Sequence, residues 1–83
     1  MRTARGWRLT ERQIETLDRL ARGDNAAEAA YTLCIAESTV KARLKAIREA
    51  TGWPGTTTGL VVEALRRGLI PIAEWPDRSQ EAL

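Results

Sequence analysis

Histidine and phenylalanine are absent from this sequence of 83 residues, and cysteine occurs once, as Cys34. The chain also has no cluster of carboxylates or thiols at metal-ligand spacing, so the commonest routes to general-base, nucleophilic and zinc chemistry are missing. We therefore expect no enzyme and no metal or cofactor site. A lone cysteine excludes an intramolecular disulfide and suits a reducing compartment. We interpret Cys34 as a small buried hydrophobic residue within a turn.

Long apolar runs are missing as well. No segment of the sequence approaches the roughly 20 residues that a membrane-spanning helix needs, and no hydrophobic segment of signal-peptide type follows the N-terminal arginines. We expect a cytoplasmic protein without membrane contact. The length allows a single domain.

The net charge of +2 is small, but the cations are unevenly distributed. Arg2, Arg5 and Arg8 open the chain without an intervening acid, which makes residues 1–8 a basic arm. Such an arm is either an unstructured terminus or a segment that enters a DNA minor groove. The sequence alone leaves both interpretations open.

Local signals predict four helices and hence an all-α fold. Thr10 and Gln13 have the spacing of a capping box, as do Asn25 and Glu28, and Gly23 is well placed to end the first helix. The predicted helices span about residues 11–22, 25–33, 37–51 and 57–67. Tyr31 and Leu33 are expected to supply packing bulk in the second helix.

The third predicted helix is basic and amphipathic, and it follows a break of only four residues at 33–36. That break is too short for the chain to travel far, so the second and third helices must cross steeply, which is the layout of a helix-turn-helix. One face gathers the core candidates Val40, Leu44, Ile47 and Thr51. The opposite face and its flanks gather Ser38, Lys41, Ala42, Lys45 and Glu49, with Arg43 and Arg48 at the edges. A DNA phosphate backbone is the obvious partner for such a row of cations.

Several ordered motifs resemble the DNA-binding domain of LuxR-type (GerE-like) transcription regulators. The match covers residues 9–70 and includes Thr39-Val40-Lys41, the glycines at 23, 52 and 68, and the segments at 9–10, 20–21 and 60–61. Two positions depart from the family pattern: Ala27 replaces a customary phosphate-contacting lysine, and Ala36 replaces the serine that usually caps the third helix. Loss of such a cap is expected to cost about 1 kcal/mol of helix stability.

The resemblance implies that the third helix lies in the major groove of double-stranded DNA. The residues expected to contact DNA are Ser38, Thr39, Val40, Lys41, Ala42, Arg43, Lys45 and Arg48. Within this set Ser38, Lys41, Ala42 and Lys45 are candidates for base edges, and Thr39, Arg43 and Arg48 for phosphates. The fourth helix of such proteins often forms a homodimer contact, which here implies Leu60, Val62, Leu65 and Arg66.

The predicted function is that of a small sequence-specific transcription regulator. The alternative is a helical protein-interaction module that binds an RNA polymerase subunit or another regulator. Residues 71–83 form a C-terminal tail that packs on the domain or joins a dimer interface. We expect Trp7, Trp53 and Trp75 to pack around the helices rather than stack on bases.

Overall fold

The structure, a computed structural model, describes residues 6–75 of the chain. In this range the backbone forms α1 (Glu11–Ala21), α2 (Ala26–Leu33), α3 (Glu37–Thr51), α4 (Thr57–Arg66) and the short 3-10 helix η1 (Ile72–Glu74). No strand occurs between residues 6 and 75. The predicted all-α fold is confirmed, and each predicted helix agrees with the observed one to within one residue at either end. Arg2 and Arg5 of the predicted arm, and residues 76–83 of the predicted tail, lie outside the described residues.

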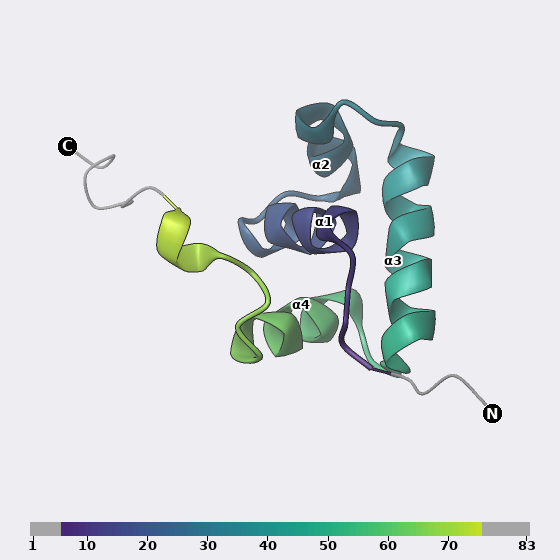
Figure 1. Cartoon of the computed structure of the whole chain (residues 1–83). Coiled ribbons are helices and arrows are strands. Elements are labelled where there is room, and N and C mark those ends of the chain that lie inside the picture. Colours follow the sequence, from purple (N-terminus) through teal and green to yellow (C-terminus); the bar gives the residue numbers. More distant parts are fainter. Residues whose placement is uncertain (1–5, 76–83) are drawn as a thin grey trace.

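Helix α1 occupies the middle of the molecule and packs against each of the other three α-helices (Figure 1). Helix α2 lies on one side of α1 and α4 on the other, while α3 runs along the flank and packs on α1 and α2. One side of α3 therefore meets the rest of the protein, and the other side faces outward.

Capping side chains set where α1 and α2 begin. Thr10 Oγ1 accepts the Gln13 backbone N–H at 3.1 Å, and the Thr10 N–H donates to Gln13 Oε1 at 2.8 Å. Asn25 and Glu28 form the same reciprocal pair, with both bonds at 2.8 Å. Both predicted capping boxes are confirmed, and each satisfies a donor that the first helical turn leaves without an intrahelical partner.

Each of the four α-helices is followed by a residue with positive φ, and the residues after α2 and α3 are informative about the helix-turn-helix. Gly52 ends α3 with φ of 73° and donates its N–H to the Arg48 carbonyl at 2.8 Å. Cys34, between α2 and α3, also adopts left-handed backbone, with φ of 60°, and its side chain is exposed. The interpretation of Cys34 as a buried hydrophobic residue is therefore wrong: the residue ends α2, and its position in the turn directs the thiol toward solvent.

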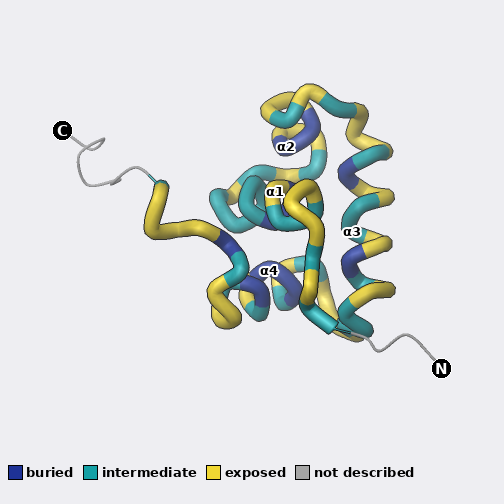
Figure 2. Tube along the Cα trace, in the orientation of Figure 1, coloured by how far each residue is buried: buried dark blue, intermediate teal, exposed yellow. Residues whose placement is uncertain are grey.

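The core consists of two clusters of buried residues. Figure 2 shows the buried positions, in dark blue, on the sides of α2, α3 and α4 that face the interior of the molecule. The larger one joins α1, α3 and α4 through the buried residues Leu17, Ile47, Leu60, Val61, Ala64 and Ile70. The smaller one joins α2 to α3 through Ala29, Ala30 and Val40. Leu20 and Leu44 pack against both clusters and connect them. The small alanines of α2 allow α3 to approach closely. Tyr31, which was expected to add bulk here, is 87% exposed on the outer side of α2, so that expectation is wrong.

Indole side chains close the ends of the fold, as predicted. Trp7 and Trp53 meet edge to face with their ring centroids 6.2 Å apart, and both pack against the larger cluster. Trp75 packs against the same cluster from the other end of the described chain. No helix among the described residues is both long and apolar enough to cross a bilayer.

Candidate nucleic-acid interface

Helix α3 separates core residues from cations by its periodicity. Val40 and Ile47 are fully buried, whereas the exposed positions lie at four-residue spacing in two neighbouring stripes. One stripe carries only small side chains, those of Ser38, Ala42, Ala46 and Ala50. The other is charged and consists of Glu37, Lys41, Lys45 and Glu49. We call these eight residues the α3 outer face.

Lys41 and Lys45 are the only lysines in the sequence, and they lie one helical turn apart on this face. Lys41 Nζ lies 3.4 Å from Glu37 Oε2, with 67% and 49% of the two side chains exposed. An exposed pair of this kind contributes about 0.3–0.5 kcal/mol, so Glu37 holds Lys41 only weakly. Lys45 forms no salt bridge within residues 6–75. Both ammonium groups can therefore turn to an external anion at small cost.

The two flanking arginines are less accessible. The Arg43 guanidinium donates to Thr16 Oγ1 at 3.3 Å, and Thr16 is a buried polar residue of α1 whose hydroxyl also donates to the Arg12 carbonyl at 3.0 Å. Arg48 donates to the Gly55 carbonyl and to Thr57 Oγ1, both near the beginning of α4. Arg48 thus connects α3 to α4, and its guanidinium is engaged within the protein rather than on the α3 outer face. Arg43 stays at the edge of the interface.

The resemblance also suggested Val40 as a contact residue, and the structure corrects this. Its side chain has no exposed surface and packs with Ala29 and Ala30 in the smaller core cluster. Thr39, one position earlier, is partly buried beside it. The exposed residues of the predicted contact set are Ser38, Lys41, Ala42 and Lys45, which are the four candidates for base edges.

Helix α3 begins without a capping side chain. Its N-cap is Ala36, in extended backbone, and no side chain accepts a backbone N–H of the first turn. The expected loss of the serine cap is therefore confirmed. The first turn is exposed at Glu37 and Ser38, where water can satisfy these donors.

The predicted dimer residues of α4 separate into buried and accessible ones. Leu60 has no exposed surface and belongs to the larger core cluster, so it cannot contact a second molecule and that prediction is wrong. Val62 is 55% exposed, and Leu65 is partly buried. Arg66 extends into solvent and binds Glu63, with the closest nitrogen and oxygen 2.7 Å apart. Hydrogen bonds from Arg66 and Arg67 lower the pKa of Glu63 below its ordinary value.

A shallow groove separates α4 from α2 beside α3. Its volume is about 530 Å³. Apolar side chains from three helices dominate its lining: Leu20, Leu44, Val61, Val62 and Leu65. Lys41 stands at its edge, so the groove adjoins the α3 outer face.

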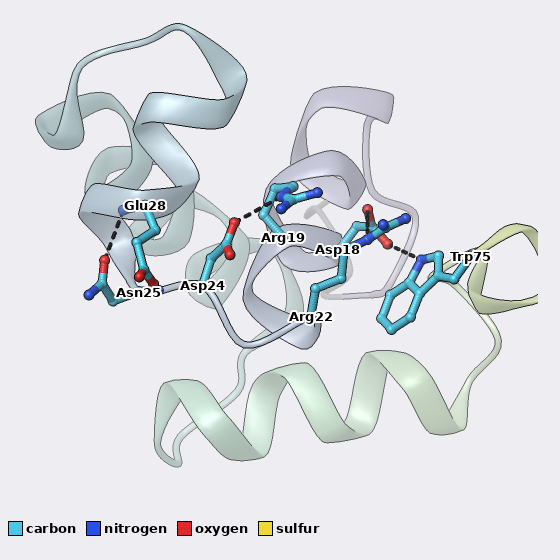
Figure 3. Close-up of polar contacts among 7 residues, drawn as sticks. All are labelled: Asp18, Arg19, Arg22, Asp24, Asn25, Glu28 and Trp75. Carbon is cyan, nitrogen blue, oxygen red and sulfur yellow. Dashed lines mark hydrogen bonds and ion pairs between the residues drawn. The ribbon is translucent and has the colours of Figure 1, made fainter. Parts of the chain in front are cut away.

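Polar side chains form a network around the C-terminal end of α1 and the short connection that leads into α2 (Figure 3). The Trp75 indole donates its Nε1–H to Asp18 Oδ1 at 2.7 Å. Arg22 binds the other oxygen of Asp18 at 3.1 Å and lies over the Trp75 ring, 4.4 Å from its centroid. Arg19 donates to Asp24 at 2.9 Å just before α2. Sequence reasoning missed the contact of Trp75 with Asp18, because no local pattern relates Trp75 to a residue of α1. It also missed the pair of Asp18 and Arg22, which their i,i+4 spacing could have indicated.

Among residues 6–75, no group of three or more histidine, cysteine, aspartate or glutamate side chains is arranged to hold a metal ion. Comparison with known proteins finds no matching family model, no matching curated protein and no matching solved structure.

Proposed function

We propose that the protein binds double-stranded DNA in a sequence-specific manner and acts as a transcription regulator, with α3 in the major groove. The observation that carries the proposal is the α3 outer face, where both lysines of the chain extend outward beside a stripe of small side chains. The resemblance of residues 9–70 to LuxR-type domains supports the same assignment. The proposal gives the protein no catalytic role and places it in the cytoplasm.

The dimensions and chemistry of the outer face suit a major groove. That groove is about 12 Å wide and admits one α-helix. Ser38, Ala42 and Ala46 leave the backbone of α3 unobstructed, so the helix can approach the base edges closely. Lys41 and Lys45 can donate to the acceptors of guanine, and the Ala42 methyl can contact a thymine methyl. Arg43, at the edge of the face, is placed to meet a phosphate.

The proposed DNA-bound form is a homodimer. With Leu60 in the core, the accessible residues of α4 available for such a contact are Val62, Leu65 and Arg66. A two-fold dimer would double the phosphate contacts and would match a palindromic or repeated half-site.

A second candidate function is a helical protein-interaction module. The observation that favours it is the apolar groove between α2 and α4, next to the exposed Val62. An RNA polymerase subunit or another regulator could dock there. Stable stoichiometric capture of such a protein by the full chain, without retention of any duplex, would favour this alternative over DNA binding.

The test of DNA binding begins with selection of bound sequences from a random duplex pool, which also reveals half-site spacing. Affinity for the selected duplex is then measured by fluorescence anisotropy for the wild type and for Lys41→Gln/Lys45→Gln. We expect roughly 30-fold or greater loss, because two base contacts contribute about 1 kcal/mol or more each. Equal affinity of the double variant at physiological salt would rule out α3 as the reading helix.

Two matched variants separate base reading from charge. Lys41→Arg/Lys45→Arg keeps both charges but replaces each ammonium group by a planar guanidinium group, so it should retain the salt dependence of binding while it changes the affinity for the selected duplex. Glu37→Gln removes the acid beside Lys41 and should tighten binding. All variants are checked by far-ultraviolet circular dichroism, since each change lies on the exposed face and should leave the helices intact.

A further inference from the structure

The groove between α2 and α4 has the size and the lining of a small-molecule site. All four α-helices contribute to it, among others through Leu20 of α1, Ala26 of α2, Leu44 of α3 and Val61 of α4. Its volume of about 530 Å³ lies within the range of roughly 300–1,000 Å³ that is typical of sites for small ligands. Such sites are mostly apolar and carry a few polar groups that fix the orientation of the ligand.

The charges at the rim of the groove favour an anion. Asp24 and Lys41 are the only ionisable residues among the described ones that line it. Asp24 Oδ2 accepts a hydrogen bond from Arg19 Nε at 2.9 Å, and only 18% of the Asp24 side chain is exposed (Figure 3). Lys41 has only its weak, exposed pair with Glu37, which lies outside the lining and exchanges readily for another anion. The rim therefore presents one positive charge that is not firmly paired.

The apolar surface around the groove is limited in extent. Val62 is exposed within the lining, whereas Tyr31 and Ile72, the other exposed large hydrophobic residues of the described chain, do not line the groove. A stable interface with another protein needs about 800 Å² of surface from each partner. The dimensions of the groove therefore favour a small ligand over a docked protein.

We infer that this groove binds a free carboxylate that carries an apolar chain of medium length. The carboxylate pairs with the Lys41 ammonium at the rim, and the chain lies on the apolar lining formed by Leu44, Val62 and Leu65. Both parts of the ligand are needed, because an exposed ion pair alone contributes little to affinity and the chain alone does not use the charge at the rim.

Occupation of the groove has a consequence for the α3 outer face, to which Lys41 also belongs. One ammonium group cannot pair with the carboxylate and donate to a base edge at the same time. A bound ligand should therefore lower the affinity for the duplex and act as an effector that releases DNA. This consequence rests on the proposed function, whereas the binding site itself does not.

The test of the site uses the full chain labelled with ¹⁵N, without DNA, and three probes below their micelle-forming concentrations: decanoate, decyltrimethylammonium and acetate. Decanoate should cause saturable shifts of the backbone amides of Leu44, Val62 and Leu65. Decyltrimethylammonium has an equal chain and the opposite charge, so it should bind roughly fivefold more weakly or worse. Acetate has no chain and should cause no saturable shift.

Three outcomes of this titration would overturn the inference. The absence of saturable shifts with decanoate would leave the groove to a protein partner. Equal affinities for decanoate and decyltrimethylammonium would show that the rim does not select an anion. Shifts of the same amides on simple dilution, without any probe, would show that a second copy of the chain fills the groove.

Matched variants locate the carboxylate. Lys41→Gln should lose roughly two- to fivefold in affinity for decanoate, the change that corresponds to one exposed ion pair. Lys45→Gln removes the same charge one helical turn away, outside the lining, and should keep the wild-type affinity for decanoate. Equal losses in the two variants would indicate general attraction by the basic helix and would refute the site.

A second pair of variants acts from α4. Thr58 is exposed and lines the groove in the first turn of α4, where an acid is compatible with the helix dipole. Thr58→Glu should weaken decanoate binding roughly two- to fivefold by like-charge repulsion, whereas the uncharged Thr58→Gln should not. Circular dichroism checks that both variants keep their helices, and equal affinities of the two would count against the site.

The effect on DNA is measured by anisotropy with the selected duplex. Saturating decanoate should lower the affinity of the wild type roughly fivefold, through loss of one base contact, and should leave that of Lys41→Gln unchanged. Unchanged wild-type affinity would reject the role as an effector. If decanoate bound as described and no duplex did, only the proposed function would fail; if a duplex bound and decanoate did not, only the inference would fail.

Discussion

The backbone of Cys34 carries a cost that its side chain does not offset. Left-handed conformation costs an L-residue roughly 1–2 kcal/mol relative to glycine. The thiol is exposed, so it gains little from packing. The conformation allows a connection of only three residues, 34–36, in which the Ile35 N–H returns to the Ala30 carbonyl at 3.0 Å.

We predict that Cys34→Gly is more stable than Cys34→Ala. Both changes remove the thiol, but only glycine relieves the left-handed strain, while its greater freedom in the unfolded chain reduces the gain. The expected difference in free energy of unfolding is about 0.5–1 kcal/mol. Urea denaturation of the two variants measures it, and equal midpoints would show that the turn is not strained.

The error over Cys34 has a physical explanation. Cysteine is often buried, and composition alone supports that expectation. The backbone, not the hydrophobicity of the side chain, sets the exposure of Cys34. The chain changes direction between α2 and α3, and the residue at this turn faces solvent. Leu60 and Val40 show the converse, because residues assigned to contacts by resemblance proved to be core.

At the scale of elements, α3 stands apart from α1 and α2 because its N-terminus has no capping side chain. α1 and α2 begin with reciprocal capping boxes, and Thr56 caps α4 by accepting the Gly59 N–H at 3.0 Å. Helix α3 compensates by its length of 15 residues and by the burial of Val40 and Ile47. Its first turn should therefore fray more readily than those of the other α-helices.

We predict that Ala36→Ser stabilises the protein by about 1 kcal/mol, because the hydroxyl can accept a free N–H of the first turn. Ala42→Ser introduces the same side chain in the middle of the exposed face, where there is no N–H to cap. That control should be neutral or slightly destabilising, by less than about 0.5 kcal/mol. Thermal unfolding of both variants compares them, and equal shifts would contradict a capping effect.

Element bounds were predictable because the signals are local. Thr10, Gln13, Asn25 and Glu28 occur within one turn of the helix starts that they determine, and Gly52 ends α3 directly. The division of α3 into core and outer faces also followed from spacing alone. The partners of side chains from different helices could not be predicted from spacing. The hydrogen bonds of Arg43 with Thr16 and of Arg48 with Thr57 are examples.

At the scale of the whole molecule, Trp75 joins the C-terminal end of the described chain to α1. Its hydrogen bond with Asp18 connects residues 57 positions apart in the sequence, and it holds η1 against α1. The expectation that Trp75 packs on the helices is confirmed. Its partner could not be predicted, since the contact exists only after α4 has brought the following chain back to α1.

We predict that Trp75→Phe lowers the free energy of unfolding by about 1.5–3 kcal/mol, because it removes a hydrogen bond to a charged carboxylate. Trp53→Phe is the matched control. It removes the bond from Trp53 Nε1 to the neutral Thr56 carbonyl, at 3.0 Å, and should cost only about 0.5–1.5 kcal/mol. Denaturant unfolding measures both.

A double change tests the source of this effect. If the bond to Asp18 is responsible, Trp75→Phe and Asp18→Asn should be clearly non-additive in a double-mutant cycle. Additive losses, or a Trp75→Phe variant as stable as wild type, would show that the bond does not hold the C-terminal segment in solution.

The edge-to-face pair of Trp7 and Trp53 gives the protein an optical signature. Two indoles held at fixed separation and orientation couple their electronic transitions, and this coupling adds a paired positive and negative band to the circular dichroism spectrum. Release of Trp7 from α3 would abolish these bands without melting any helix. The spectrum can therefore report, without an added label, whether Trp7 stays packed on Trp53 as solution conditions change.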